Sequence, residues 1–192
     1  AVGFSCTYAD LAGNDIASAI TVATSGAVII DNTHPTMTPV SIVETGDGNA
    51  NDGDDITLSF TASEGIQTPT CTFTSGGAAM ADSSITVAEG DNNAWTCVLD
   101  VANGDTDGTV AFSIAFTDDA GNAGTAVSAV TDVTAVTVDN THPTLSTPAI
   151  TVNGDGNANN ADTVTLTFTS SNDVTTAPTC AFTDGGSNAM DA

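Results

Sequence analysis

The sequence of 192 residues contains no lysine and no arginine, while its 24 aspartates and glutamates give a formal net charge of -24. A surface with this charge repels nucleic-acid phosphates and anionic lipid headgroups, and it attracts only cations or basic partners. Nucleic-acid binding is therefore excluded. Enzymes that rely on a phosphate clamp, a Schiff-base lysine or a cationic oxyanion stabiliser are also excluded, because the chain has no lysine or arginine to supply these groups.

Histidine is almost as scarce, since the chain has only His34 and His142. Each lies beside a proline in a different part of the chain, so the two cannot meet in one domain to bind zinc or to serve a Ser-His-Asp triad. We therefore expect no enzymatic activity. No apolar run approaches the roughly 20 residues that span a bilayer, so we also expect no membrane insertion of this segment.

The four cysteines are Cys6, Cys71, Cys97 and Cys180, and no two of them have the Cys-x-x-Cys spacing. Zinc ribbons and thioredoxin-like redox motifs use that spacing, so neither is expected. Disulfides in a protein outside the cell are the better interpretation.

A repeated pattern is the most informative feature that is present. The hexapeptide Asp-Asn-Thr-His-Pro-Thr begins at Asp31 and recurs letter for letter from Asp139, 108 positions later. Gly-Asp-Gly-Asn-Ala-Asn begins at Gly46 and recurs from Gly154 with the same spacing, which we call the repeat spacing. Pro-Thr-Cys at 69–71 recurs at 178–180, after one inserted residue.

This spacing divides the chain into three parts. Residues 1–36 are the C-terminal part of one repeat, residues 37–144 are a complete repeat, and residues 145–192 are the N-terminal part of a third. Two explanations stay open at this point. The chain is a section of a longer array, or it is a subunit whose ends complete each other across an interface.

Within the complete repeat, apolar and polar residues alternate with a period of two, which is typical of half-buried strands. Because 40% of the residues are hydrophobic and regularly spaced, we expect a folded chain despite its charge. Gly, Asn and Asp clusters separate the strands as turns. We predict an all-β fold with seven antiparallel strands in the repeat, at 39–45, 54–62, 67–74, 84–88, 94–101, 109–117 and 124–138. This size and pattern match an immunoglobulin-like sandwich.

Two motifs carry a family resemblance: Thr-Asp-Asp-Ala-Gly-Asn at 117–122, and Val-Asp-x-Thr-x-Pro-Thr at 138–144. With them, the chain resembles the bacterial-type Ig-like repeats of large surface adhesins and extracellular fibre proteins. The resemblance covers the whole chain. It implies tandem immunoglobulin-like β-sandwich repeats with the length of the repeat spacing. These repeats would form an extended extracellular array that is often stiffened by calcium and acts as a stalk, adhesin or filament.

Two of the cysteines are expected to meet in the core. Cys71 and Cys97 each lie on the apolar face of a predicted strand, so we predict a disulfide between them, worth roughly 3 kcal/mol in the chain-entropy model. Two free buried thiols are the alternative. Cys180 occupies the position of Cys71 in the third repeat, and Cys6 occupies the inward-facing position of Ile114.

Acidic residues gather in Gly-rich loops, where oxygen ligands at alternate positions suit calcium. A polar turn that hydrogen-bonds itself is the alternative. In a seven-strand sandwich several of these loops share one pole, and crowded carboxylates repel each other unless a cation bridges them. The candidate calcium ligands, including one from the following repeat, are Asp47, Asp54, Asp105, Asp107, Asp139 and Asp173. By the same argument, Glu64, Asp118 and Asp119 would gather at the junction that follows Asp31.

Our first functional hypothesis is a structural component of an extracellular filament, stalk or surface appendage, which associates with copies of itself or with neighbouring repeats. The alternative is a calcium-dependent adhesin, or a module that binds carbohydrate or a cell surface. A sugar-binding module would present an aromatic platform, but Trp95 and Tyr8, the single tryptophan and tyrosine, fall on predicted core faces. The sequence therefore favours the filament, in a secreted or cell-surface location.

Overall fold

The computed structural model describes residues 2–15, 18–22, 26, 28–46, 48–80, 84–154, 156–159, 161–172, 174 and 176–183. The chain divides into two compact units, Ala1–Asn140 and Thr141–Ala192. Over the described ranges the fold is all-β, with a single turn of 3-10 helix, η1 (Asp91–Asn93). No helix in this part of the chain is long and apolar enough to cross a bilayer.

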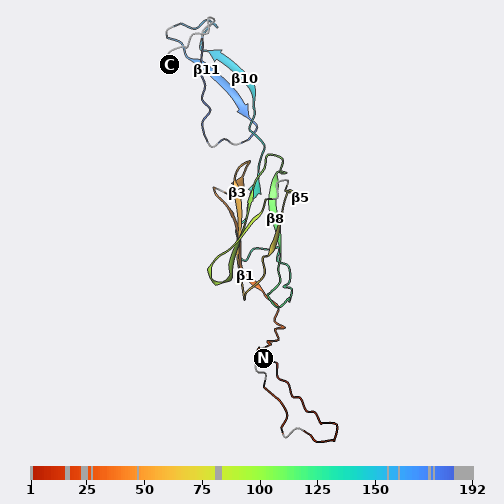
Figure 1. Ribbon diagram of the computed structural model, residues 1–192. Helices are drawn as coiled ribbons and strands as arrows, with labels where there is room; N and C mark the ends of the chain where they lie inside the picture. Colours follow the sequence, from red (N-terminus) through yellow and green to blue (C-terminus); the bar gives the residue numbers. More distant parts are fainter. Residues whose placement is uncertain are drawn as a thin grey trace. The chain divides into compact units, whose positions relative to one another are not determined.

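Two sheets form the centre of the first unit (Figure 1). One sheet has the strand order β1-β3-β7-β6 and the other has the order β2-β9-β8-β4-β5. The strand bounds are β1 (Met37–Glu44), β2 (Asn49–Ala50), β3 (Asp55–Ala62), β4 (Thr70–Ser75), β5 (Ala78–Ala79), β6 (Thr86–Glu89), β7 (Ala94–Asp100), β8 (Gly108–Ala115) and β9 (Thr137–Val138). All strand pairs are antiparallel except β2 with β9, which is parallel.

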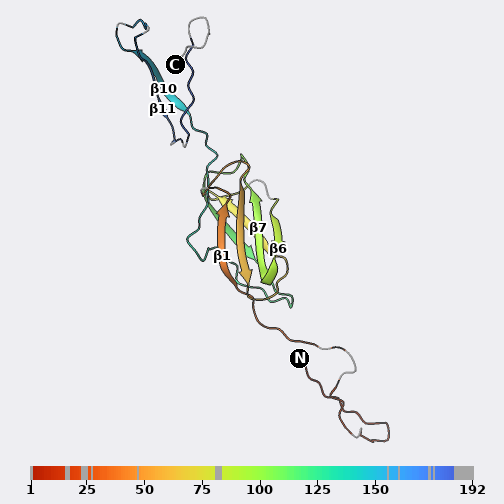
Figure 2. The same ribbon diagram turned by 90° about the vertical axis from the view of Figure 1, so that its left-hand side faces the viewer.

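The two sheets pack face to face as a β-sandwich, because their inward side chains form one apolar cluster. Strand β3 illustrates the cause: its apolar residues occupy every second position, so Ile56, Leu58 and Phe60 are all buried while their neighbours are partly exposed. Figure 2 shows the outer side of the sheet that contains β1, β7 and β6. The predicted all-β fold with antiparallel sheets is confirmed.

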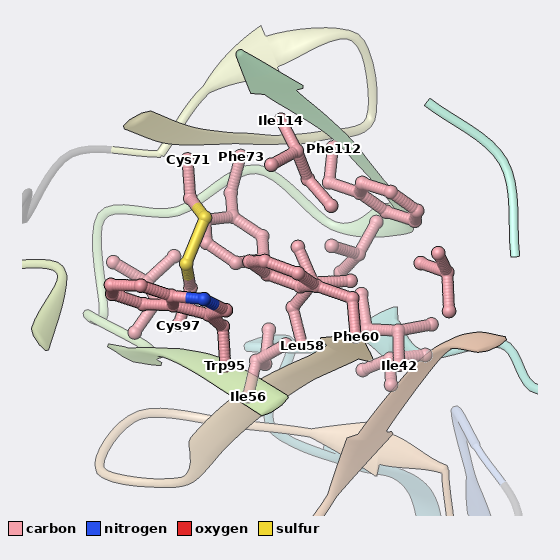
Figure 3. Close-up of a cluster of buried hydrophobic side chains, with 14 of the residues drawn as sticks. Ile42, Ile56, Leu58, Phe60, Cys71, Phe73, Trp95, Cys97, Phe112 and Ile114 are labelled. Carbon is pink, nitrogen blue, oxygen red and sulfur yellow. A yellow bond between two sulfur atoms is a disulfide. The ribbon is translucent and has the colours of Figure 1, made fainter. Parts of the chain in front are cut away.

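A disulfide joins the two sheets through this core. Cys71 on β4 and Cys97 on β7 are bonded, with their Cα atoms 6.5 Å apart, and the prediction from the strand faces is confirmed. Figure 3 shows the sulfur atoms between the sheets, next to the indole of Trp95. Trp95 is buried, as predicted, although its Nε1 atom has no hydrogen-bond partner.

The prediction of one continuous strand at 124–138 is wrong. Val127 pairs with Ile114 through two backbone hydrogen bonds, but the chain then leaves β8 and returns only at β9. Between these points it runs along the edge of β1, where the Thr131 and Thr134 hydroxyls accept hydrogen bonds from the Val40 and Ile42 N–H groups. Thr131 N–H also donates to the Val40 carbonyl at 2.8 Å. Two side-chain oxygens and one backbone N–H thus cover the edge of β1.

The described residues between 2 and 30 form an extended hairpin (Figure 1), and several of its hydrogen bonds match those of residues 110–138. The contact of Cys6 with Ile20 differs by one residue from that of Ile114 with Val127. Val2 N–H donates to the Val28 carbonyl at 2.7 Å, as Val110 N–H does to the Val136 carbonyl at 2.9 Å. Tyr8, however, is 65% exposed, and Cys6 is exposed as well. The burial expected for both is therefore not found here, because the described residues place no facing sheet over them.

The second unit contains one hairpin, β10 (Leu145–Val152) with β11 (Val164–Ser170), paired antiparallel. Its register repeats that of β1 and β3 one repeat spacing later: Ile42 lies opposite Leu58, and Ile150 lies opposite Leu166. The irregularity near the start of β1 recurs near the start of β10. Unlike the buried residues of β3, the apolar side chains of β11 remain partly exposed.

Candidate functional site

Three carboxylates come together where the N-terminal segment meets the sandwich. Asp31, Glu64 and Asp118 each offer a carboxylate oxygen, and these oxygens lie within 4.8 Å of one another. Glu64 follows β3 and Asp118 follows β8, while Asp31 precedes β1 along the chain. Among the described residues, this is the only such group of metal-ligating side chains.

Asp118 is the fixed member of the group and is only 1% exposed. Its carboxylate accepts hydrogen bonds from the backbone N–H and the side-chain amide of Asn122, at 2.7 and 2.8 Å. Burial alone would raise the pKa of Asp118, but these bonds and those from the neighbouring backbone N–H groups lower it below the ordinary value. Asp118 is therefore held in its charged form.

Glu64 is the member of the group whose charged form is disfavoured. Its half-buried position raises the pKa of its carboxyl, and the negative charges of Asp31 and Asp118 raise the pKa further. The chain contains no lysine or arginine that would compensate these charges. A cation from solution would remove this repulsion.

The segment before β1 is bound to the same pole of the sandwich. The amide of Asn122 donates to the Asp31 carbonyl at 3.1 Å, and His34 Nδ1 lies 2.8 Å from the Ala123 carbonyl. Pro35 is fully buried. Asp31 is thus placed beside Asp118 by contacts that do not involve its own carboxylate, whose Oδ1 instead accepts from Thr33 N–H at 2.9 Å.

The calcium ligands predicted at the opposite pole include carboxylates that already accept hydrogen bonds from the backbone of their own loops. Asp54 accepts from Asn51 N–H at 2.9 Å, and Asp105 accepts from Ala102 N–H at 3.0 Å. Asp107 lies in the loop of Asp105, whereas Asp139 directly follows β9, and both have interactions of their own. These four residues form no group of three adjacent carboxylates within the described ranges. Asp47 and Asp173 lie outside the described residues.

Asn140 connects these loops, a role that the sequence analysis missed. Its side-chain oxygen accepts from Asp52 N–H at 2.9 Å, and its amide donates to the Ala102 and Asp105 carbonyls at 3.1 Å each. Its backbone N–H donates to Asp107 at 2.7 Å. The signal was present in the sequence, because Asn140 belongs to the hexapeptide that occurs twice.

Hollows formed by described residues of the sandwich differ in their lining, and one of them includes a single carboxylate, Glu44. The hollow over Thr72, Phe73, Met80 and Leu99 has an almost wholly apolar lining. The carboxylate group is therefore the arrangement best suited to bind a ligand, and hard divalent cations suit its oxygen atoms. No protein-family model matches this sequence, and neither a curated protein nor a solved structure is significantly similar to it.

Proposed function

We propose that this chain is a structural component of an extracellular filament, stalk or surface appendage built from immunoglobulin-like repeats. The observation that carries the proposal is that hydrogen bonds of the central sandwich recur, one repeat spacing away, in the segments on both sides of it. Such recurrence is typical of stacked repeat proteins, in which each unit is one copy of the same local fold.

On the N-terminal side, Asp10 N–H donates to the Asn14 carbonyl at 3.0 Å, as Asp118 N–H does to Asn122. On the C-terminal side, Asn159 N–H donates to Asp162 at 2.9 Å, as Asn51 N–H does to Asp54. These turns lie at the positions that the repeat spacing predicts. This supports a division into repeats at 36/37 and 144/145.

Two further features support a location outside the cell. The disulfide between Cys71 and Cys97 lies in the core, and disulfides persist in oxidising compartments. A chain without lysine or arginine also offers trypsin-like proteases no cleavage site. Both properties suit a protein that must last in an extracellular medium.

Calcium at the carboxylate group is a second part of the proposal. Asp31, Glu64 and Asp118 would hold the ion, and their oxygen atoms are the donors that calcium prefers. When bound, the ion supplies positive charge that this chain lacks. Because Asp31 precedes the sandwich while Glu64 and Asp118 belong to it, one ion would fix the segment that enters the repeat.

Immunogold labelling of the native material tests the proposed function. An antibody raised against the central unit should decorate fibres or stalks outside the cell at regular intervals. Label confined to the cell interior, or spread over the surface without any appendage, would contradict the filament.

Thermal unfolding tests the calcium proposal separately, with the emission of Trp95 as the probe. Calcium should raise the unfolding temperature above that in chelator, and sodium chloride of equal ionic strength should not. Glu64→Gln should lose the calcium response, whereas the control Asp91→Asn, which removes one exposed charge elsewhere, should keep it. An equal response in both variants would show that calcium acts by general screening.

A further inference from the structure

The dipeptide Asn-Gly occurs twice in the chain, at Asn103–Gly104 and at Asn153–Gly154, and aspartate follows it both times. In this dipeptide the backbone nitrogen of the glycine can attack the side-chain carbonyl carbon of the asparagine, because the two are held close and glycine has no side chain to hinder the approach. Since the local sequence is the same at both sites, the folded structure decides which of them reacts.

Asn103 and Gly104 form the tip of a turn between β7 and β8, and both are exposed. The turn is closed by two hydrogen bonds: Asp105 N–H donates to the Ala102 carbonyl at 2.9 Å, and Ala102 N–H donates to the Asp105 carboxylate at 3.0 Å. Neither bond involves the Asn103 carboxamide or the Gly104 N–H, and no described residue hydrogen-bonds either group. The side chain is therefore free to rotate, and the N–H is open to water.

The space around Gly104 is open. A Cβ atom placed on Gly104 would have no atom within 4 Å beyond those of the adjacent residues, and the φ angle of Gly104 lies outside the left-handed region. The Asn103 side chain thus reaches the Gly104 nitrogen without displacing another part of the sandwich. An alanine would also fit at this position without strain.

The second dipeptide is held differently. The Asn153 side-chain oxygen accepts a hydrogen bond from Thr163 N–H, and Asn153 N–H donates to the Thr163 carbonyl at 3.3 Å. Thr163 directly precedes β11, so the Asn153 side chain is fixed across the hairpin of the second unit. Its hydrogen bond must break before the carboxamide turns toward the nitrogen of Gly154. The structure thus protects Asn153 and leaves Asn103 accessible.

We propose that Asn103 is a modification site, at which the folded protein deamidates through a succinimide formed with Gly104. The Gly104 nitrogen loses its proton to hydroxide and bonds to the Asn103 Cγ atom. The bond from Cγ to Nδ2 breaks, and ammonia leaves after taking a proton from water, which regenerates the hydroxide. Water then adds to one of the two ring carbonyls and opens the ring to aspartate or isoaspartate. The overall reaction consumes one water and releases one ammonia, and it needs no oxidant and no enzyme.

The turn that carries this site also holds Asn140. The Asn140 amide donates to the Ala102 and Asp105 carbonyls, at 3.1 Å each, and these two residues flank the dipeptide. Isoaspartate carries the main chain through its own side-chain carbon, so it lengthens the chain between the two carbonyls by one atom. Isoaspartate should therefore displace the acceptors of Asn140, whereas aspartate adds only an exposed charge. Deamidation at Asn103 thus loosens the loops that Asn140 joins.

Hydroxylamine tests the reactivity of the two sites, because it cleaves the chain at a succinimide. In mildly alkaline buffer the native full-length chain should be cut after Asn103 at least about tenfold faster than after Asn153, since one ordinary hydrogen bond protects the second site. In strong denaturant, where that bond is lost, the two sites should be cut at similar rates. Mass spectrometry of the fragments identifies each cut.

Two variants identify the reacting groups. Gly104→Ala keeps the turn, because alanine fits there, but its methyl group hinders the attacking nitrogen, so cutting after Asn103 should slow severalfold while cutting after Asn153 stays the same. Asn103→Gln has a longer side chain that cannot close the five-membered ring, and it should not be cut at this site. Unchanged Trp95 emission shows that each variant is folded.

Ageing of the chain in buffer without hydroxylamine tests the effect on the loops. The isoaspartate form, isolated by ion-exchange chromatography and identified in peptic peptides, should unfold at a lower urea midpoint than the fresh chain. Asn103→Asp has the added charge but an unaltered main chain, so this control should keep the wild-type midpoint. In Asn140→Ala the isoaspartate should lower the midpoint less, because the bonds that it disturbs are already absent.

Equal cutting of the two sites in the native chain would overturn the assignment of Asn103, and so would a wild-type rate in Gly104→Ala. An isoaspartate form with the midpoint of the fresh chain would overturn its effect on the Asn140 contacts. All of these measurements use the purified chain, so they do not depend on the proposed function. Their failure would leave the immunogold result as it stands.

Discussion

The central sandwich and the segments that flank it have the same local structure but very different burial. Phe112 on β8 is 8% exposed, whereas Phe4, its counterpart one repeat earlier, is 43% exposed. Leu58 on β3 is fully buried, whereas Leu166 on β11 is partly exposed in the same register. The hydrogen bonds of the turns are nevertheless alike, and the register of β10 with β11 repeats that of β1 with β3.

This difference shows that turn geometry and hairpin register are determined by a short segment, whereas burial is determined by the complete sandwich. Turn geometry and hairpin register depend on residues close in sequence, so they recur in the flanking segments as well as in the centre. Burial depends on a second sheet that covers the apolar face, and the described residues provide one only in the centre. An isolated two-stranded hairpin is marginally stable in water, so the stability of this chain should reside in the sandwich.

The comparison is tested most strongly by removing the same side chain from both places. Leu58→Ala opens a cavity in the closed core and should cost about 2–5 kcal/mol of unfolding free energy. Leu166→Ala removes a side chain that no described sheet covers and should leave the unfolding of the sandwich unchanged. Urea unfolding followed by Trp95 emission measures both, because this single tryptophan lies in the sandwich core. Equal losses would show that the two regions unfold as one body.

The next largest effect should come from the disulfide. Reduction of Cys71–Cys97, whose partners are separated by 26 positions in the sequence, should lower the unfolding free energy of the sandwich by roughly 3 kcal/mol. Cys97→Ala, which also removes the bond, should cost a similar amount. Reduction should have no effect on the Cys97→Ala variant, and a further loss there would show that the reductant acts elsewhere.

The alternating pattern of the sequence predicted the strands whose faces are buried, together with the disulfide, because a period of two places alternate side chains on one face. It failed at 124–138. Four of the five valines there, at 127, 130, 133 and 136, follow a period of three, which would place successive valines on opposite faces of a strand. Val133 is accordingly fully exposed. The path along β1 depends on Thr131 and Thr134 meeting the edge of a strand that is distant in sequence.

The carboxylate group was predictable in part. The topology of a seven-strand sandwich predicted that Glu64 and Asp118 lie at the pole near Asp31. The structure places the three carboxylates together. The larger set at the other pole could not be resolved from sequence, because aspartates in Gly-rich turns serve equally well as hydrogen-bond acceptors for their own loops. Asp54 and Asp105 do so here.

A smaller effect should follow from Asn140, the residue that joins the loops at that pole. Asn140→Ala removes three side-chain hydrogen bonds in a partly buried site, and it should cost about 1–3 kcal/mol. Asn32→Ala, at the matching position of the first hexapeptide, is the control and should have a smaller effect. The urea midpoints of the two variants decide this. A larger loss for Asn32→Ala would place the main junction before the sandwich and not after it.

The smallest effect should come from Glu64, and its sign depends on pH. In the second unit the matching position is Asn172, an uncharged amide, so Glu64→Gln gives both positions an uncharged amide side chain. Burial, then Asp31 and Asp118, raise the pKa of Glu64 in the folded state. A raised folded pKa means that the folded protein binds this proton more tightly, so stability is lost as pH rises through that pKa.

In chelator at neutral pH, Glu64→Gln should therefore unfold at higher urea than the wild type. The gap should close as pH falls and Glu64 becomes protonated. At still lower pH both proteins should weaken together, because the lowered pKa of Asp118 makes its contribution disappear only on further acidification. Urea midpoints over a pH series give the two curves. A variant that is less stable than the wild type at neutral pH would contradict this prediction. It would show that the Glu64 carboxylate makes stabilising contacts that outweigh its repulsion by Asp31 and Asp118.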